Sequence, residues 1–270
     1  MSIDQKRGND LAQMKGASAW LTSLPLREEG YVLNKREFFD AISLRYRWGV
    51  KRLPTNCACG QKFDMDHAMI CKKGGYVHRR HDGMRDLIAN LMDDIAHEVH
   101  TEPNLQPLSG EELPKGANKE DQARLDIAAR GFWQDFEMAF FDIKVFHPFA
   151  RSHLSNNLES VFRTNETQKK NAYNRRVIQV EHGSFSPIVF SSFGGYGFET
   201  GRVIDKLIEK IAEKKDLMHS VVANYVRTKL SFQLIKSQVA AIRGSRRMKK
   251  MLVDTGEIEI VTTTATINNR

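Results

Sequence analysis

The apolar positions of the chain alternate between helical and strand spacing. Apolar residues recur every three or four positions in several segments, and helices are predicted at 35–47, 83–98, 200–215 and 217–242, with a more polar one at 158–176. Short β-branched or apolar runs bounded by turn residues predict strands at 99–105, 123–129, 138–146, 177–181 and 187–191. Because residues 138–146 are apolar on both faces, they are expected to form a central strand.

This pattern predicts an α/β (α+β) fold in which a mixed sheet is flanked by helices. The expected organisation along the chain is a disordered tail at 1–16, a helical segment with a metal-binding knuckle at 17–82, an α/β core at 83–215, a long basic helix at 216–250 and a loose tail at 251–270. Asn34 is suited to cap the helix at 35–47.

Composition narrows the class of protein. With 270 residues, 41% of them hydrophobic, the chain can bury one large core or two modest ones. No apolar run approaches the roughly 18 residues that span a bilayer. The first twenty residues also lack the apolar region of a secretory signal, so we expect an intracellular protein with no membrane partner.

The net charge of +8 favours a polyanionic partner. Residues 217–250 contain eight Lys and Arg residues and no Asp or Glu. This stretch is predicted to bind phosphates, with Arg243, Arg246 and Arg247 as candidates for nucleic-acid contact. A solvated helical face, or a nuclear-import signal at 246–250, is the alternative.

All three cysteines lie within fifteen positions, in the pattern C-x-C-x7-H-x3-C. Cys57, Cys59, His67 and Cys71 offer three thiolates and one imidazole, the donor set of a closed structural zinc site. Asp66 is expected to cap a short helix that carries His67 and Cys71. Buried thiols beside an unrelated histidine are the alternative, and His78 and His81 are spare ligands.

Two carboxylates and a lysine indicate phosphodiester chemistry. Asp126 lies in one strand-like run, and Asp142 and Lys144 lie two positions apart in another, so the last two share a face of the sheet. Carboxylates on neighbouring strands can hold Mg²⁺, and a lysine beside them can activate water. Glu102 or Glu98 could supply a further ligand, and a plain ion pair at a strand end is the alternative.

These residues, set in helix–strand–strand–strand–helix–strand order, resemble the PD-(D/E)XK restriction-endonuclease-like fold, with Leu125 in place of the proline. A broader resemblance covers residues 17–247. The strings CACG, DHAMIC, RRHDGMRD, FFDIKVFHP and KKNAY are similar to the C-terminal region of reverse transcriptase polyproteins from non-LTR retrotransposons, where a zinc knuckle precedes a DNA-nicking endonuclease.

The resemblance implies site roles and partners. The catalytic residues would be Asp126, Asp142 and Lys144. The Mg²⁺ ligands would be the same two aspartates and Glu102. A lysine–tyrosine block would add three catalytic residues, Lys169, Lys170 and Tyr173. We expect nucleic-acid contacts from Arg79, Arg80 and His81 in the nucleus, with target DNA as the partner and RNA as the alternative. An inactive zinc-knuckle nucleic-acid-binding protein and a basic structural protein are the alternatives. The oligomeric state is open.

Other motifs are incomplete. His97-Glu98-Val99-His100 places its histidines three apart, whereas a zinc protease needs them four apart. The glycines at 195, 197 and 201 do not match a dinucleotide fingerprint, and no Walker A string or zinc-deaminase motif occurs. These motifs therefore supply no competing function, and the resemblance implies a nuclease without the polymerase that accompanies it in the polyproteins.

Overall fold

The computed structural model describes residues 3–246. In chain order its elements are α1 (Ile3–Gln13), α2 (Ala19–Thr22), α3 (Lys35–Arg45), α4 (Met65–Ile70), α5 (Tyr76–Asp93), β1 (Glu98–Thr101), β2 (Ile127–Arg130), β3 (Met138–Phe146), α6 (Leu158–Arg176), the π-helical turn η1 (Val177–Glu181), β4 (Ser184–Ser191), α7 (Phe198–Lys215) and α8 (His219–Arg243). Within this part of the chain, none of the helices is both long enough and apolar enough to cross a membrane.

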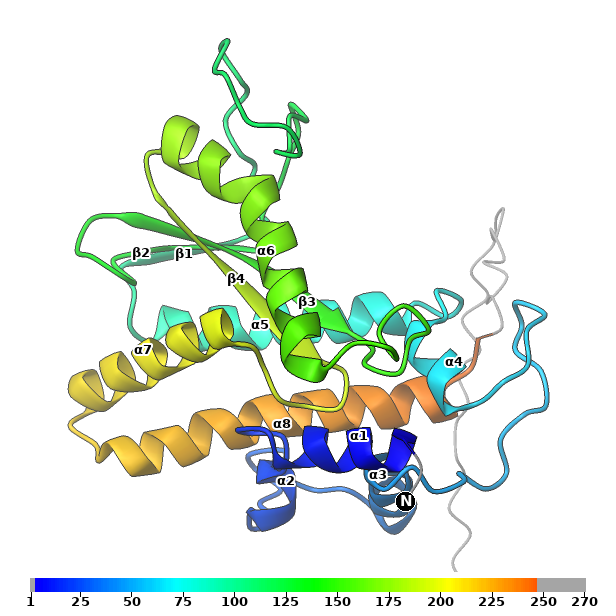
Figure 1. Cartoon of the computed structure of the whole chain (residues 1–270). Helices are drawn as coiled ribbons and strands as arrows, with labels where there is room; N and C mark the ends of the chain where they lie inside the picture. The colour runs from blue at the N-terminus through cyan, green and yellow to red at the C-terminus, as the bar shows by residue number, and fades with distance from the viewer. Residues whose placement is uncertain (1–2, 247–270) are drawn as a thin grey trace, which may run out of the picture.

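One mixed sheet organises these elements. The strands lie in the order β1-β2-β3-β4; β1, β2 and β3 are antiparallel neighbours, whereas β4 runs parallel to β3. A parallel neighbour requires a crossover connection, which α6 and η1 supply between β3 and β4 (Figure 1). The predicted mixed sheet flanked by helices is confirmed, with α5 before β1 and β3 in the interior of the sheet.

Alternate residues of β3 enter two different cores. Phe141 and Ile143 pack with apolar residues of α5, α7 and α8, which cover one face. Phe140 packs with Val177 at the end of α6, and Phe146 packs within another cluster that includes residues of α6. Because side chains alternate along a strand, Asp142 and Lys144 lie on the face of the sheet that packs against α6.

Helix α8 is a central structural helix. It contacts α5 and α7 on the sheet side, α2 and α3 on the other side, and α4 near its C-terminal end (Figure 1). Its cations pair with acidic residues from other elements: Arg227 with Asp205, Lys229 with Glu29, and Arg243 with the buried Asp40. The helix is confirmed. Its fourth described cation, Lys236, donates to the Gly30 carbonyl and has no acidic partner among the described residues, and phosphate binding by this helix stays a prediction.

Three local predictions are corrected. Residues 3–13, expected to be disordered, form α1, in which Leu11 is buried and Arg7 donates to backbone carbonyls of residues 153 and 156. Residues 177–181, expected to be a strand, form η1, because Val177 and Val180 are buried three positions apart. Helix α5 begins at Tyr76 and runs through the predicted boundary at residue 82. The predicted tail at 251–270 lies outside the described residues.

Candidate functional site

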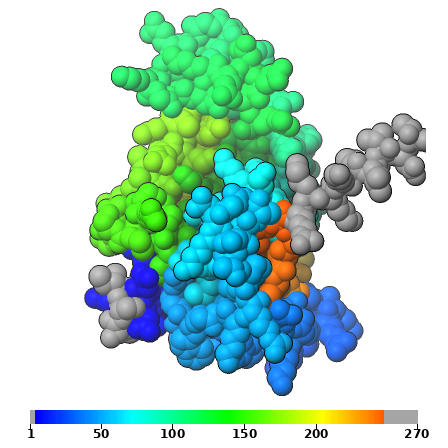
Figure 2. Space-filling model, turned by 90° about the vertical axis from the view of Figure 1, so that its right-hand side faces the viewer, coloured from blue at the N-terminus to red at the C-terminus, as the bar shows by residue number. Residues whose placement is uncertain are grey.

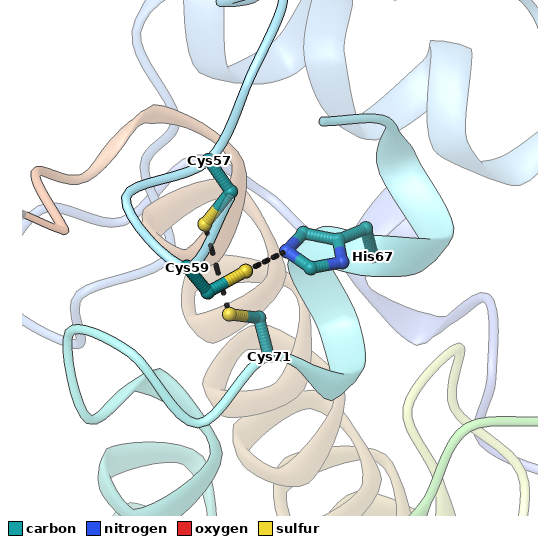
Figure 3. Close-up of side chains that lie close together, drawn as sticks. All are labelled: Cys57, Cys59, His67 and Cys71. Carbon is teal, nitrogen blue, oxygen red and sulfur yellow. Dashed lines mark hydrogen bonds between the residues drawn. The ribbon is translucent and has the colours of Figure 1, made fainter. Parts of the chain in front are cut away.

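The four predicted zinc ligands lie together, as Figure 3 shows. Their donor atoms are all within 4.8 Å of one another; the Cys57 and Cys71 sulfurs are 3.7 Å apart, and the Cys59 sulfur is 3.3 Å from His67 Nε2. Tetrahedral Zn²⁺ would separate two thiolates by about 3.8 Å and a thiolate from an imidazole by about 3.6 Å. The donor set and the spacing both fit zinc.

Local turns and caps build this cluster, hereafter the knuckle (residues 57–71). Gly60 adopts a φ of 88°, which allows the turn after Cys59. Helix α4 begins after Asp64, whose carboxylate accepts from the backbone N–H of His67, and ends at Cys71. The prediction that Asp66 caps this helix is wrong. The cap lies two residues earlier and leaves Asp66 free for another contact.

Asp66 connects the knuckle to the sheet. Its carboxylate accepts from Arg47 Nη1 and Nη2 at 2.8 and 2.7 Å and lies 3.1 Å from Nε2 of His147, which follows β3 directly. Burial opposes ionisation of Asp66, but the hydrogen bonds from His147 and Arg47 outweigh it and lower its pKa to about 2. The ligand helix of the knuckle is thereby fixed to the end of the strand that carries Asp142 and Lys144.

The two predicted catalytic aspartates lie near each other but do not form a cross-strand pair. Asp126 directly precedes β2, and its N–H donates to the Phe141 carbonyl at 3.0 Å, whereas the ladder of β2 and β3 ends where Ile127 pairs with Phe141. Burial raises the pKa of Asp142, and the charge of Asp126 adds to this effect. The structure therefore brings together the two carboxylates that the sequence placed on neighbouring strands.

Two lysines face this pair. Lys169, from α6, forms an ion pair with Asp142 that partly offsets the effect of burial on its pKa. Lys144 lies two residues after Asp142 on the same strand face and is 3.4 Å from Gln168 Oε1. Burial and the nearby charge of Lys169 lower the pKa of Lys144, so this lysine loses its proton more readily than an exposed one.

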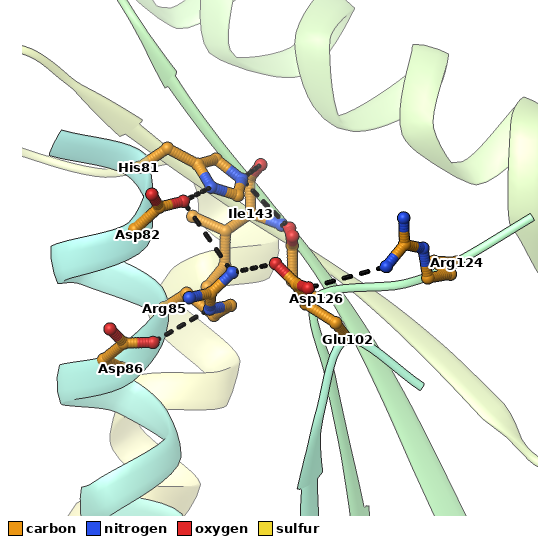
Figure 4. A network of polar contacts seen from close by, with 8 residues as sticks. All are labelled: His81, Asp82, Arg85, Asp86, Glu102, Arg124, Asp126 and Ile143. Carbon is orange, nitrogen blue, oxygen red and sulfur yellow. Dashed lines mark hydrogen bonds and ion pairs between the residues drawn. The ribbon is translucent and has the colours of Figure 1, made fainter. Parts of the chain in front are cut away.

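His81 contacts the carboxylate of Asp126, a role that sequence reasoning missed. Its Nε2 lies 3.2 Å from Asp126 Oδ2 and 3.1 Å from the Ile143 carbonyl, and the same carboxylate oxygen accepts from the Ile143 N–H (Figure 4). The hydrogen bond to Asp126 raises the pKa of His81 to about 9. The RHD string marked this residue, but only the packing of α5 against the sheet reveals the contact.

Glu102 does not join the aspartates. Its carboxylate pairs with Arg85 and lies 3.6 Å from Arg124 (Figure 4). Among residues 3–246 the knuckle is the only cluster of three or more His, Cys, Asp or Glu side chains placed to share one ion. The alternative ligand, Glu98, pairs with His100 and Arg130. Any Mg²⁺ at this site would therefore depend on Asp126 and Asp142, which is enough for an ion that keeps most of its waters.

The lysine–tyrosine block divides between two places. Lys169 faces Asp142, but Lys170 pairs with Glu199 at the start of α7, at 2.7 Å. Tyr173 packs against Phe185, and its hydroxyl is 3.3 Å from the Asn118 amide. Of the three, only Lys169 contacts an aspartate, and the ring of Tyr173 lies beside it, with Lys169 Nζ 5.9 Å from the ring centroid.

The predicted nucleic-acid contacts are only partly accessible. Arg79 is exposed, whereas Arg80 is 2% exposed and donates to the Met69 carbonyl. Arg246 is also buried and stacks over Phe63 and Tyr76. The prediction that Arg80 and Arg246 contact nucleic acid is wrong, because their guanidinium groups support the knuckle from inside. Arg243 pairs with the buried Asp40 but remains 20% exposed, and Arg247 lies outside the described residues.

Comparison of the sequence with protein-family models and with curated proteins finds no match. Two sites indicate the chemistry of the chain. One is a Cys3His cluster that could bind zinc, and the other is a carboxylate–lysine site on the sheet, in which 15 residues separate Asp126 from Asp142.

Proposed function

We propose that the chain is a metal-dependent DNA endonuclease with a restriction-endonuclease-like PD-(D/E)XK core, derived from a non-LTR retrotransposon and acting in the nucleus. One observation carries the proposal: Asp126, directly before β2, lies close enough to Asp142 of β3 for its charge to act on that carboxyl group, and Lys144 shares the strand face of Asp142. A half-buried lysine and a buried aspartate are costly to place in a sheet core, and such groups concentrate where chemistry is performed.

Asp126 and Asp142 would hold Mg²⁺, which supplies charge stabilisation and an activated water for phosphodiester hydrolysis. His81 would fix Asp126 in place through the contact at 3.2 Å. Lys144, whose pKa is lowered by burial, can orient the attacking water and accept its proton as the leaving oxygen departs from phosphorus. Lys169 would shift from Asp142 to the phosphate when a cation is bound by the carboxylates.

The knuckle would hold zinc in a closed site and so act in structure and positioning. Its coupling to His147 supports this role, because the contact fixes the strand that carries Asp142. DNA would be the substrate, and RNA is a further possible partner.

A plasmid-nicking assay tests the proposal. Zinc-loaded wild-type protein is expected to nick supercoiled DNA when Mg²⁺ is added, and Asp142→Ala and Lys144→Ala are expected to lose nicking while they retain DNA binding and an unchanged circular dichroism spectrum. Asp94→Asn is the matched control, since Asp94 lies at the far end of α5 from His81 and pairs only with Lys215 among the described residues. Nicking by Asp142→Ala at the wild-type rate would refute the assignment.

One observation favours an alternative function. Lys169 forms an ion pair with Asp142, and a structural ion pair of this kind also fits a nuclease core that has decayed into a nucleic-acid-binding module. In that case the wild-type protein would not nick DNA in Mg²⁺ and would still bind it with an affinity that falls steeply with salt.

A further inference from the structure

An aromatic and basic segment follows α3. Residues 45–52 read Arg-Tyr-Arg-Trp-Gly-Val-Lys-Arg, with no acidic residue. Tyr46 and Trp48 are 41% and 52% exposed, and their rings stack with centroids 5.0 Å apart and planes 25° from parallel. Neither ring belongs to a hydrophobic core of the described protein, whereas Trp20 is buried in one. Large aromatic side chains supply the most stabilisation when buried, so an exposed stacked pair suggests a binding surface.

The backbone holds both rings outward. Arg47, between them, points into the protein: its guanidinium lies 4.0 Å from the Phe149 ring centroid and pairs with Asp66. Arg47 adopts a left-handed φ of 56° where α3 ends, and the Trp48 N–H donates to the Ser43 carbonyl at 2.8 Å, so this turn fixes the backbone between the two exposed rings. The stacked pair is therefore a supported feature of the surface.

Unpaired cations surround this segment. Seven exposed Lys and Arg residues of α3, the knuckle and the segments beside them form no ion pair within residues 3–246: Lys35, Arg36, Lys51, Arg52, Lys62, Lys72 and Lys73. Of the acids in α3 and the knuckle, Asp40 pairs with Arg243 and Asp66 with Arg47, whereas Glu37 and Asp64 accept only backbone hydrogen bonds at helix starts. This surface is therefore positive, whereas most cations of α8 are paired. Figure 2 shows the light-blue and cyan residues of this region as one face beside the orange end of α8.

A cleft continues the surface into the knuckle. It has a volume of about 520 Å³ and is lined by Arg36, Arg52, Asn56, Ala58 and Arg243. The Cα atoms of Trp48 and Arg52 are at most about 14 Å apart, because four residue steps join them. One short stretch of an extended ligand could therefore contact both the stacked rings of Tyr46 and Trp48 and the basic cleft.

We propose that Tyr46 and Trp48, together with Arg36 and Arg52 at the cleft, bind an unpaired DNA strand. Positive charge selects a polyanion, and an exposed aromatic ring adds affinity only for bases that are not already stacked in a duplex. The choice of DNA over RNA rests on the proposed function, because an unpaired strand arises beside a nick in DNA. Binding of an unpaired strand rests on this surface alone.

Fluorescence anisotropy with zinc-loaded full-length protein in magnesium-free buffer tests the proposal without any cleavage. The probes are a labelled oligothymidylate, a duplex of the same length and an oligouridylate. We expect the oligothymidylate to bind more tightly than the duplex. We expect Trp48→Ala to weaken oligothymidylate binding by about tenfold, which is the loss expected from removing one stack between a base and an aromatic ring. Trp48→Phe keeps a ring and is expected to bind nearly as the wild type. Phe136→Ala removes another exposed aromatic, 81% exposed, and is expected to have no effect.

Two further readouts sharpen the test. Trp48 is the most exposed tryptophan, so oligothymidylate is expected to quench the intrinsic fluorescence of the wild type but not of Trp48→Phe. Arg52→Ala is expected to reduce the slope of log affinity against log salt by about 0.7. Oligothymidylate binding that is unchanged in both Trp48→Ala and Tyr46→Ala would overturn the proposal, and tighter binding of oligouridylate would overturn the choice of DNA. Loss of nicking activity would affect neither result.

Discussion

Replacing Asp66 with asparagine would separate the knuckle from the sheet without removing a zinc ligand. Asp66 accepts two hydrogen bonds from Arg47, whose side chain is only 8% exposed, and contacts His147, which is 4% exposed. The variant leaves a buried guanidinium without its counter-charge, which is the costly way to break an ion pair.

The size of the effect follows from the pKa of Asp66. Its decrease from the usual 3.8 to about 2 corresponds to about 2.4 kcal/mol in favour of the charged form. The Asp66 side chain is 36% exposed, and solvent screening reduces this to about 1–2 kcal/mol. Because the pKa is lowered in the folded state, this stability is fully present above pH 3.8 and is lost as the pH falls toward 2.

Urea denaturation of the zinc-loaded protein at pH 7 measures the effect. We expect Asp66→Asn to lower the free energy of unfolding by about 1–2 kcal/mol, or the melting temperature by about 2–8 °C. A double-mutant cycle with Arg47→Met isolates the pair and is expected to give a coupling of about 1 kcal/mol. A coupling near zero, with both single variants as stable as the wild type, would refute the conclusion that this contact fixes the knuckle to β3.

Other outcomes follow from the same structure. Cys71→Ser is expected to abolish stoichiometric zinc binding, measured by metal analysis, and to lower the melting temperature, since Cys71 closes a buried cluster; full zinc retention would contradict the ligand assignment. Phe141→Ala, at a side chain with 0% exposure, is expected to cost about 3–5 kcal/mol in urea denaturation, and a loss below 1 kcal/mol would show that Phe141 is not in the core. His81 has a raised pKa in the folded state, so the stability of the wild type relative to His81→Gln in magnesium-free buffer should be greatest below pH 6.5 and disappear as the pH rises through about 9; a difference that is constant over this range would argue against the contact with Asp126.

Elements with strong local signals could be predicted from the sequence. β3 and α6 have the predicted bounds, because β3 is a run between turns that is apolar except for Asp142 and Lys144, and α6 begins directly after the cap residue Asn157. The turn η1 was missed because its β-branched residues favour a strand locally, whereas the chain must close α6 before it enters β4. Helix α1 was missed because its stabilising contacts, such as Arg7 with residues 153 and 156, come from far along the chain.

The candidate site, too, could be predicted from the sequence only where local patterns determine it. The period of two along β3 and the spacing of the cysteines and histidine were enough to group Asp142 with Lys144 and to assemble the knuckle. The contact between His81 and Asp126 spans 45 positions and depends on how α5 packs against the sheet. The pairing of cations along α8 could not be predicted, because acidic partners such as Asp40 lie about 200 positions away. Local patterns specify which groups are available, and tertiary packing decides which of them reach solvent.

The most direct test of the proposed nuclease is a metal titration of plasmid nicking by the zinc-loaded wild-type protein. Mg²⁺ is omitted and then restored, since a chelator would also remove zinc from the knuckle. Nicking that is absent without Mg²⁺, appears on its addition and is lost in Asp142→Ala is the predicted result. Retention of DNA in a salt-sensitive complex, with no nicking at any Mg²⁺ concentration, would contradict catalysis at Asp126 and Asp142.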